Sequence, residues 1–132
     1  MQLSKFTDYS FRALIYLAEN ENKLCTIDEI AKNLNISEHH LKKIINKLAK
    51  TEYIISIKGR NGGLKLGISP SLINLGSILK ITEDNLNLVE CFGENNNCSL
   101  CKGNICKLNP IISSSLEKFF QEFSKYTLAD II

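Results

Sequence analysis

Two short amphipathic patterns, separated by a tight polar turn, dominate residues 26–48 of this 132-residue chain. Thr26 followed by Glu29 is a capping box, which predicts that a helix starts there. Ser37 supplies the hydroxyl that caps a second helix. Two helices joined by so short a turn predict a helix-turn-helix, and this constrains the chain to a mainly α-helical DNA-binding type of fold. The apolar positions at helical spacing are Ile27, Ile30, Ala31 and Leu34, then Leu41, Ile44, Ile45 and Leu48.

The second predicted helix exposes long cationic and amide side chains on its outer face. Such side chains can reach phosphates and base edges when a helix lies in a major groove. Residues 38–67 hold seven Lys or Arg and two Glu, a local charge of +5 in a chain whose net charge is +2. This concentration is typical of a face that binds a polyanion, and it also fits a solvated helix face. The candidate DNA-binding residues of this helix are Ser37, His39, His40, Lys42, Lys43, Asn46 and Lys47.

A glycine-rich basic turn follows this helix, between two β-type segments. Residues 53–57 are apolar and β-branched, and residues 64–68 alternate in polarity, so we expect a β-hairpin wing. Gly62 and Gly63 are expected to supply the positive φ that the turn needs. Lys58, Arg60 and Asn61 are the candidate DNA contacts of the wing, because a basic tip can enter a minor groove or grip phosphate.

Three more helices are expected around this unit. One covers residues 8–19 with Thr7 or Asp8 as its cap, and one starts at Pro70. The last opens at Pro110 with Asn109 as its cap. Its heavy apolar stripe suits either a core or a dimer seam, and its place after a small winged domain favours a dimer. That stripe is Ile112, Leu116, Phe119, Phe120 and Phe123.

Composition and motifs restrict the class of protein. No signal peptide is evident, and the apolar run at residues 11–18 is too short to span a membrane and contains Arg12, so we expect a cytoplasmic protein. No catalytic constellation and no nucleotide-binding glycine motif is present, so an enzyme is not expected.

Four of the five cysteines lie within sixteen residues, with the spacing C-x6-C-x2-C-x4-C. In a reducing compartment such a group is more often a metal or redox site than a set of disulfides. Three interpretations remain open from spacing alone: structural zinc, an iron–sulfur cluster and a thiol–disulfide switch. Cys25 stands apart and is interpreted as a small buried hydrophobe. The clustered residues are Cys91, Cys98, Cys101 and Cys106.

Several segments together resemble the Rrf2 family of winged-helix regulators over nearly the whole chain. They are LSKFTDYSFRALIYLA at residues 3–18, HLKKIINKL at 40–48 and KGRNGG at 58–63. ECF at 90–92 and KYTLADI at 125–131 are similar to the nitric-oxide-sensing branch, more than to the branch that follows iron–sulfur cluster status. The resemblance implies a homodimeric repressor that carries an iron–sulfur cluster, binds double-stranded operator DNA and releases it when nitric oxide nitrosylates the cluster. It favours a 4Fe–4S cluster, with 2Fe–2S as the alternative.

The resemblance also implies a ligand set. The family uses three cysteines, and an acidic residue near the N-terminus of the other subunit completes the set. Cys91, Cys98 and Cys106 match the three cysteines, and Asp8 of the partner subunit matches the acidic residue. This sequence has a fourth cysteine, so Cys101 is an alternative middle or fourth ligand. Arg12, one helical turn after Asp8, is expected to pair with it when no cluster is present.

The resulting expectation is a winged helix-turn-helix with a long C-terminal dimerisation helix. Residues 1–80 form the DNA-binding domain, 81–108 the cluster-binding loop and 109–132 the dimerisation helix and C-terminal tail. The alternative functions are a family member that senses cluster status or redox state, and a zinc- or thiol-stabilised DNA-binding module without gas sensing.

Overall fold

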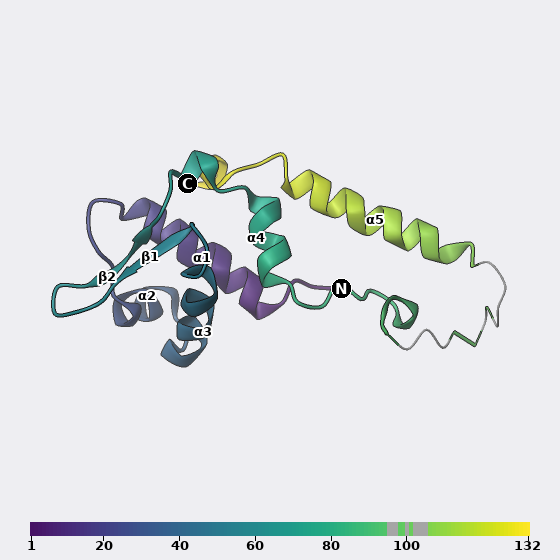
Figure 1. The fold of residues 1–132 in the computed structure, drawn as a ribbon, viewed down its shortest axis with the longest axis horizontal. Coiled ribbons are helices and arrows are strands. Elements are labelled where there is room, and N and C mark those ends of the chain that lie inside the picture. The colour runs from purple at the N-terminus through teal and green to yellow at the C-terminus, as the bar shows by residue number, and fades with distance from the viewer. Residues whose placement is uncertain (95–97, 100, 102–105) are drawn as a thin grey trace.

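The computed structural model describes residues 1–94, 98–99, 101 and 106–132. Within these residues the chain forms five α-helices, three short 3-10 helices and one two-stranded antiparallel sheet. The predicted class, mainly α with a β-hairpin wing, is therefore confirmed. Helices α1 to α3 and the hairpin make a body at one end of the molecule, and the long helix α5 extends away from it (Figure 1).

Helix α1 (Lys5–Glu19) starts earlier than the sequence indicated. The expected cap at Thr7 or Asp8 was wrong, because Ser4 Oγ accepts the Thr7 N–H at 3.2 Å and caps the helix. Thr7 is fully buried, and its hydroxyl donates to Glu83 Oε2 at 2.8 Å. The same carboxylate oxygen accepts the Ser4 N–H at 3.1 Å. A residue distant in the sequence thus helps to fix where α1 begins.

Helices α2 (Ile27–Leu34) and α3 (Glu38–Leu48) confirm the predicted helix-turn-helix. Both halves of the capping box are formed, and Asn35 ends α2 in the left-handed region at φ 52°. Ser37 Oγ accepts the His40 N–H at 3.1 Å and so caps α3. The residues buried on these two helices, all within the predicted apolar stripes, are Ile30, Ala31, Leu41, Ile44, Ile45 and Leu48.

Strands β1 (Ile54–Ile57) and β2 (Gly63–Leu66) form the predicted hairpin, with Ile54 opposite Leu66 and Ile57 opposite Gly63. Positive φ occurs at Gly59 (+108°) and Gly63 (+158°), so the expectation of positive φ at Gly62 was wrong. Gly62 is needed for a different reason: a Cβ there would lie 2.0 Å from the carbonyl oxygen of Ile57.

Cys25 extends this small sheet on the β2 side. Its backbone exchanges two hydrogen bonds with Leu64, at 3.0 and 2.7 Å. The Cys25 side chain is completely buried, and burial raises the pKa of its thiol. The prediction that Cys25 is a small buried hydrophobe is confirmed.

The segment after the wing is divided in two, in contrast to the one helix expected from Pro70. A 3-10 turn η1 (Pro70–Leu72) is followed by helix α4 (Leu75–Thr82). Asn74 makes the division, because its Oδ1 accepts the Ser77 N–H at 3.1 Å and caps a new helix. Between the two, Ile73 is extended and fully buried, and its carbonyl accepts the Leu128 N–H at 2.8 Å.

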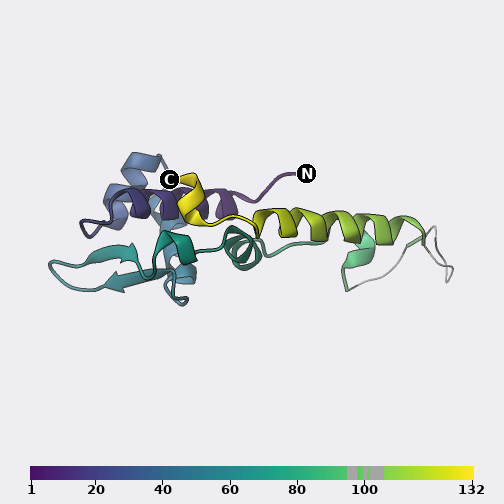
Figure 2. The ribbon, with the colours of Figure 1, turned by 90° about the horizontal axis from the view of Figure 1, so that it is seen from above.

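Helix α5 (Leu108–Phe123) runs away from the body, and the short 3-10 turn η2 (Glu90–Phe92) lies beside its N-terminal end (Figure 2). After α5 the chain returns to the body through η3 (Leu128–Ile131), which has its own capping box. Leu128 is fully buried there. The last residues therefore pack on the winged body.

No helix in the described part of the chain combines the length and the apolar character that crossing a bilayer requires.

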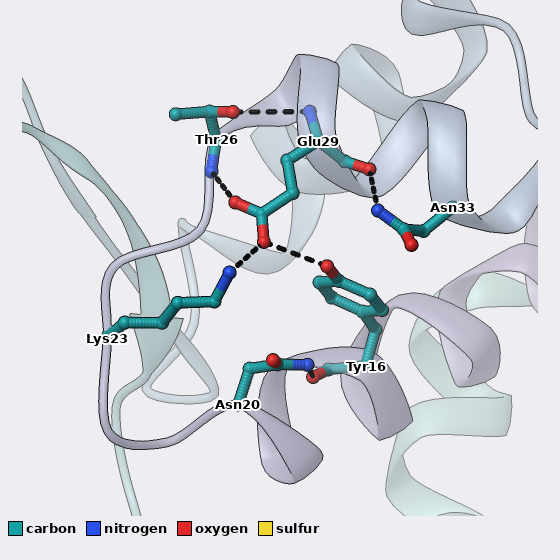
Figure 3. Close-up of polar contacts among 6 residues, drawn as sticks. All are labelled: Tyr16, Asn20, Lys23, Thr26, Glu29 and Asn33. Atoms are coloured by element: carbon teal, nitrogen blue, oxygen red, sulfur yellow. Dashed lines mark hydrogen bonds and ion pairs between the residues drawn. The ribbon is translucent and has the colours of Figure 1, made fainter.

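Glu29 connects helices α1 and α2 through its carboxylate (Figure 3). One oxygen accepts a hydrogen bond from the Tyr16 hydroxyl at 2.8 Å and forms an ion pair with the Lys23 ammonium. The other accepts the Thr26 N–H at 3.4 Å and so closes the capping box. Hydrogen bonds from Lys23 and Tyr16 hold the pKa of Glu29 below its ordinary value of 4.5. The ionised carboxylate therefore stabilises the packing of the helix-turn-helix against α1.

We expect Glu29→Gln to lower the free energy of unfolding by about 1 kcal/mol at neutral pH, the scale of a lost cap or charge-assisted hydrogen bond. Because the pKa of Glu29 is lower in the folded state, its contribution is present above pH 4.5 and is lost as pH falls through the folded pKa. Urea unfolding of both proteins at pH 7 and in the acid range measures this. The exposed Glu21→Gln is the control, and a difference independent of pH would contradict the assignment.

Candidate functional site

The outer face of α3 presents most of the predicted DNA contacts to solvent. The buried stripe fixes which side of α3 faces out, since Leu41, Ile44 and Leu48 are fully buried. The residues of the candidate set that are exposed on this helix and its cap are Ser37, His39, Lys42, Lys43 and Asn46. Lys58, Arg60 and Asn61 are exposed at the tip of the hairpin.

His40 and Lys47 differ from the rest of the set because both contact α1. The His40 ring lies 5.2 Å from the ring of Tyr9 and 6.5 Å from that of Phe6, measured between centroids. The Lys47 ammonium lies 5.4 Å from the Phe6 ring centroid. These two residues therefore join α3 to α1. The basic face that α3 leaves exposed is smaller than the set of candidate residues predicted from the sequence.

Lys47 is also paired with a carboxylate from the segment that follows α4. Its Nζ lies 2.6 Å from Asp84 Oδ1, and the Asp84 side chain is 82% exposed. The preceding residue, Glu83, holds Ser4 and Thr7 at the start of α1. Glu83 and Asp84, which begin the segment that leads to Cys91, thus contact α1 and α3 respectively.

The second candidate site lies in the cysteine segment. Asn109 connects Cys91, in η2, to Cys106, just before α5. Its backbone N–H donates to Cys106 Sγ at 3.4 Å, and its side-chain Nδ2 donates to Cys91 Sγ at 3.5 Å. Cys106 and Cys98 both raise the pKa of the Cys101 thiol. All five cysteines of the chain are described, and none forms a disulfide.

The thiols differ in their tendency to ionise. The backbone N–H of Asn109, then the thiol of Cys101 and the N–H of Leu108, lower the pKa of Cys106. This is the effect expected at a helix N-terminus, where unpaired N–H groups favour a thiolate. The hydrogen bond to Cys106, with desolvation and Cys98, raises the pKa of Cys101 to about 11. Cys106 therefore ionises more readily than Cys101.

This donor set fits a soft metal centre. Thiolates are the ligands of iron–sulfur clusters and of structural zinc, and N–H groups directed at a sulfur stabilise its charge. In the described part of the chain, no three Cys, His, Asp or Glu side chains already stand in an arrangement that could hold a metal ion. Residues 95–97, 100 and 102–105 lie outside the described residues. The choice between Cys98 and Cys101 as a ligand stays a prediction.

Asp8 lies in the first turn of α1 and pairs with Arg12, as expected. Arg12 Nε lies 3.0 Å from Asp8 Oδ1, with Arg12 55% and Asp8 45% exposed. The hydrogen bond and the charge of Asp8 raise the pKa of Arg12. Asp8 is thus accessible from outside its own chain, and its role as a metal ligand stays a prediction.

The model of the Rrf2 family, described as iron-dependent transcriptional regulators, matches residues 3–132. The chain belongs to the Rrf2 family of transcriptional regulators. The chain is 47% identical over 134 residues to the HTH-type transcriptional regulator NsrR of Bacillus licheniformis, covering 100% of this chain and 92% of that protein. Against the NsrR of Bacillus subtilis the identity is 40% over 133 residues, with coverage of 100% and 90%.

Solved structures show the same fold at lower identity. IscR of T. potens superposes with a TM-score of 0.78 at 21% identity, covering 99% of this chain and 85% of that one. CymR of B. subtilis gives 0.77 at 23% identity, covering 99% and 95%. Membership of the Rrf2 family assigns this chain to transcriptional regulation by DNA binding.

Sequence reasoning missed two residues of this Rrf2 chain. Asn109 was interpreted as a helix cap, although α5 begins at Leu108 and the Asn109 amide is directed at Cys91. Its position three residues after a clustered cysteine was the available signal. Asp84 was placed in the cluster-binding loop of residues 81–108, and no local pattern in the sequence indicates that it reaches Lys47.

We expect Asp84→Asn to increase affinity for duplex DNA about two- to fivefold and to steepen the salt dependence by up to about one unit of slope. The substitution frees Lys47 for a phosphate and removes an exposed carboxylate beside the basic face. Titration of a duplex at several salt concentrations measures both quantities.

Two variants control this experiment. Glu117→Gln makes the same charge change on α5, far along the chain from α3, and should leave affinity unchanged. Arg60→Ala, at the wing tip, should act in the opposite direction and flatten the slope by about one unit. An Asp84→Asn protein that binds like wild type would show that the pair with Lys47 does not compete with DNA.

Proposed function

We propose that this protein is an iron–sulfur-cluster-dependent transcriptional repressor, which binds operator DNA as a homodimer and is released when nitric oxide nitrosylates the cluster. The observation that carries the proposal is that Asn109, at the N-terminal end of α5, contacts the sulfur atoms of both Cys91 and Cys106. The identity of 47% to a regulator named NsrR supports it. Such a regulator would act in the cytoplasm, without a membrane.

The homodimer is supported by the unfilled apolar face of α5. Only Phe120 among the residues of this helix is buried, at 9% exposure, whereas Phe119 is 36% and Ile111 is 63% exposed. A groove of about 540 Å³ lies between α5, the end of α4 and the first residues of the chain. A second copy of α5 would cover this face, since exposed apolar surface of this kind marks an interface.

The proposed ligands are Cys91, Cys98 and Cys106 with Asp8 of the partner subunit, and Cys101 is the alternative. Within one chain, α1 and the N-terminal end of α5 lie apart in both views (Figures 1 and 2). A carboxylate from α1 therefore suits a site completed by the partner subunit. The pair of Asp8 with Arg12 is then the arrangement of the chain without that bond.

When bound, the cluster supplies iron that reacts with nitric oxide. The protein part of the response would begin at Asp8, which would bind the intact cluster and would pair with Arg12 once that bond is lost. Its neighbour Tyr9 contacts His40 on the recognition helix, with 5.2 Å between ring centroids. A shift of the first turn of α1 would thus reach α3 directly. Because two recognition helices must match the spacing of two half-sites, even a small shift weakens operator binding.

A second candidate function is a zinc- or thiol-stabilised DNA-binding module without gas sensing. The effect of both Cys98 and Cys106 on the pKa of Cys101 favours it, because it points to a fourth thiol near the others. Four thiolates form a closed structural zinc site.

Anaerobic purification separates the two candidates. For the proposed repressor we expect a brown protein with visible charge-transfer absorption and stoichiometric iron and sulfide, lost in Cys91→Ser and Cys106→Ser. Cys98→Ser and Cys101→Ser identify the third cysteine ligand, because only the ligand variant should lose iron. A colourless protein with tightly bound zinc would contradict the proposal.

Asp8→Ala tests the carboxylate ligand. We expect the variant to lose its cluster more readily and to bind operator DNA more weakly, because the partner's carboxylate no longer completes the site. Mobility-shift titrations with and without nitric oxide measure this, and Asp28→Ala, an exposed helical carboxylate paired with Lys32 at 3.1 Å, is the control. An Asp8→Ala protein that binds and responds like wild type would eliminate Asp8 from the ligand set.

A further inference from the structure

One residue, Asn109, contacts the sulfur atoms of both outer cysteines of the segment, through its side-chain amide and its backbone N–H. Its Nδ2 donates to Cys91 Sγ at 3.5 Å, while its backbone N–H donates to Cys106 Sγ at 3.4 Å. Cys91 and Cys106 belong to different elements, η2 and the start of α5, and residues 95–97, 100 and 102–105 between them lie outside the described residues. Asn109 is thus a direct link between the two ends of the cysteine segment.

The orientation of this amide has a structural cause. α5 begins at Leu108, so Asn109 already has a helical backbone and its side chain is not engaged as a cap. Pro110 follows and fixes the first turn. An asparagine held in this way can direct its side-chain N–H away from the helix end, and this N–H donates to the sulfur of Cys91.

We propose that Asn109 is a positioning residue of the cluster site, which holds Cys91 next to Cys106 and donates a hydrogen bond to the Cys91 sulfur when that sulfur is a ligand. The inference rests on the proposed cluster function. It adds a residue that is not itself a ligand and that acts through one.

Two effects follow from this role. Before a cluster is bound, the link keeps Cys91 and Cys106 within reach of each other. With a cluster bound, an N–H donor withdraws charge from the ligand sulfur, and hydrogen bonds to sulfur raise the reduction potential of iron–sulfur clusters. Asn109 would therefore set both how readily the site assembles and how electron-rich the cluster is.

The first test uses the full chain without a cluster. In a Cys98→Ser, Cys101→Ser background, the accessible thiols are Cys91 and Cys106, because Cys25 is completely buried. A short bifunctional thiol reagent then reports how often these two sulfurs meet. We expect Asn109→Ala and the isosteric Asn109→Asp to slow cross-linking about two- to fivefold, the effect of one modest hydrogen bond.

Asn87→Ala is the matched control, since Asn87 is an exposed asparagine in the segment that leads to Cys91. It should cross-link at the rate of the unsubstituted background. Circular dichroism of each variant shows whether α5 is retained. Cross-linking of Asn109→Ala at the background rate, with the helix intact, would overturn the positioning role.

The second test uses the anaerobically loaded protein with all its cysteines. Asn109→Ala should retain iron and sulfide but show a more negative reduction potential and altered visible absorption, whereas a purely structural residue would leave both unchanged. An unshifted potential in a fully loaded variant overturns the hydrogen bond to the ligand sulfur. If wild-type protein binds no iron or sulfide, the cluster function itself fails, and slower cross-linking would still support the link between Cys91 and Cys106.

Discussion

The buried face of α1 is the surface on which the rest of the molecule depends. Ala13 and Leu14 are completely inaccessible, and Thr7 is buried with its hydroxyl bonded to Glu83. Helices α2, α3 and α4, strand β2 and the C-terminal η3 all pack against this one helix. Phe11 extends the contact to α5, with its ring centroid 6.0 Å from that of Phe123. A displacement of α1 would therefore affect the positions of both α3 and α5.

The sequence predicted the elements whose boundaries are set by nearby residues. Thr26 and Ser37 find their partners three residues away, so a capping pattern sufficed to locate α2 and α3. The predictions failed where a distant residue intervenes. Thr7 was expected to cap the helix because its residue type and position suit a cap. Its hydroxyl is instead buried and donates a hydrogen bond to Glu83. Asn74 likewise divides a continuous apolar pattern, since the extended Ile73 pairs with Leu128 near the end of the chain.

The candidate site shows the same limit for charges. Residue types identified the basic face, but they did not separate Lys42 and Lys43, which are exposed, from Lys47, which is paired with Asp84 and lies over Phe6. An intramolecular carboxylate at this place lowers the positive potential offered to a polyanion. Through Asp84, the segment that continues to Cys91 also contacts α3. Counting charges along the sequence therefore overstates the free basic face, and only packing shows which cations have partners.

The proposed cluster ligands belong to two separate parts of the chain, the cysteine segment and α1. Asn109 joins Cys91 and Cys106 at the far end of α5. Helix α1, which carries the proposed ligand Asp8, lies apart from that end in the same chain (Figure 1). In the proposed dimer this carboxylate would come from the partner subunit, and the exposed apolar stripe of α5 offers the surface on which two subunits would associate. Because Tyr9, next to Asp8, touches His40, the carboxylate is adjacent to the contact that orients α3. In a dimer built on α5, loss of one inter-subunit bond at Asp8 would act on α1 of one subunit, and so on its recognition helix, without any change in the remaining α5 interface.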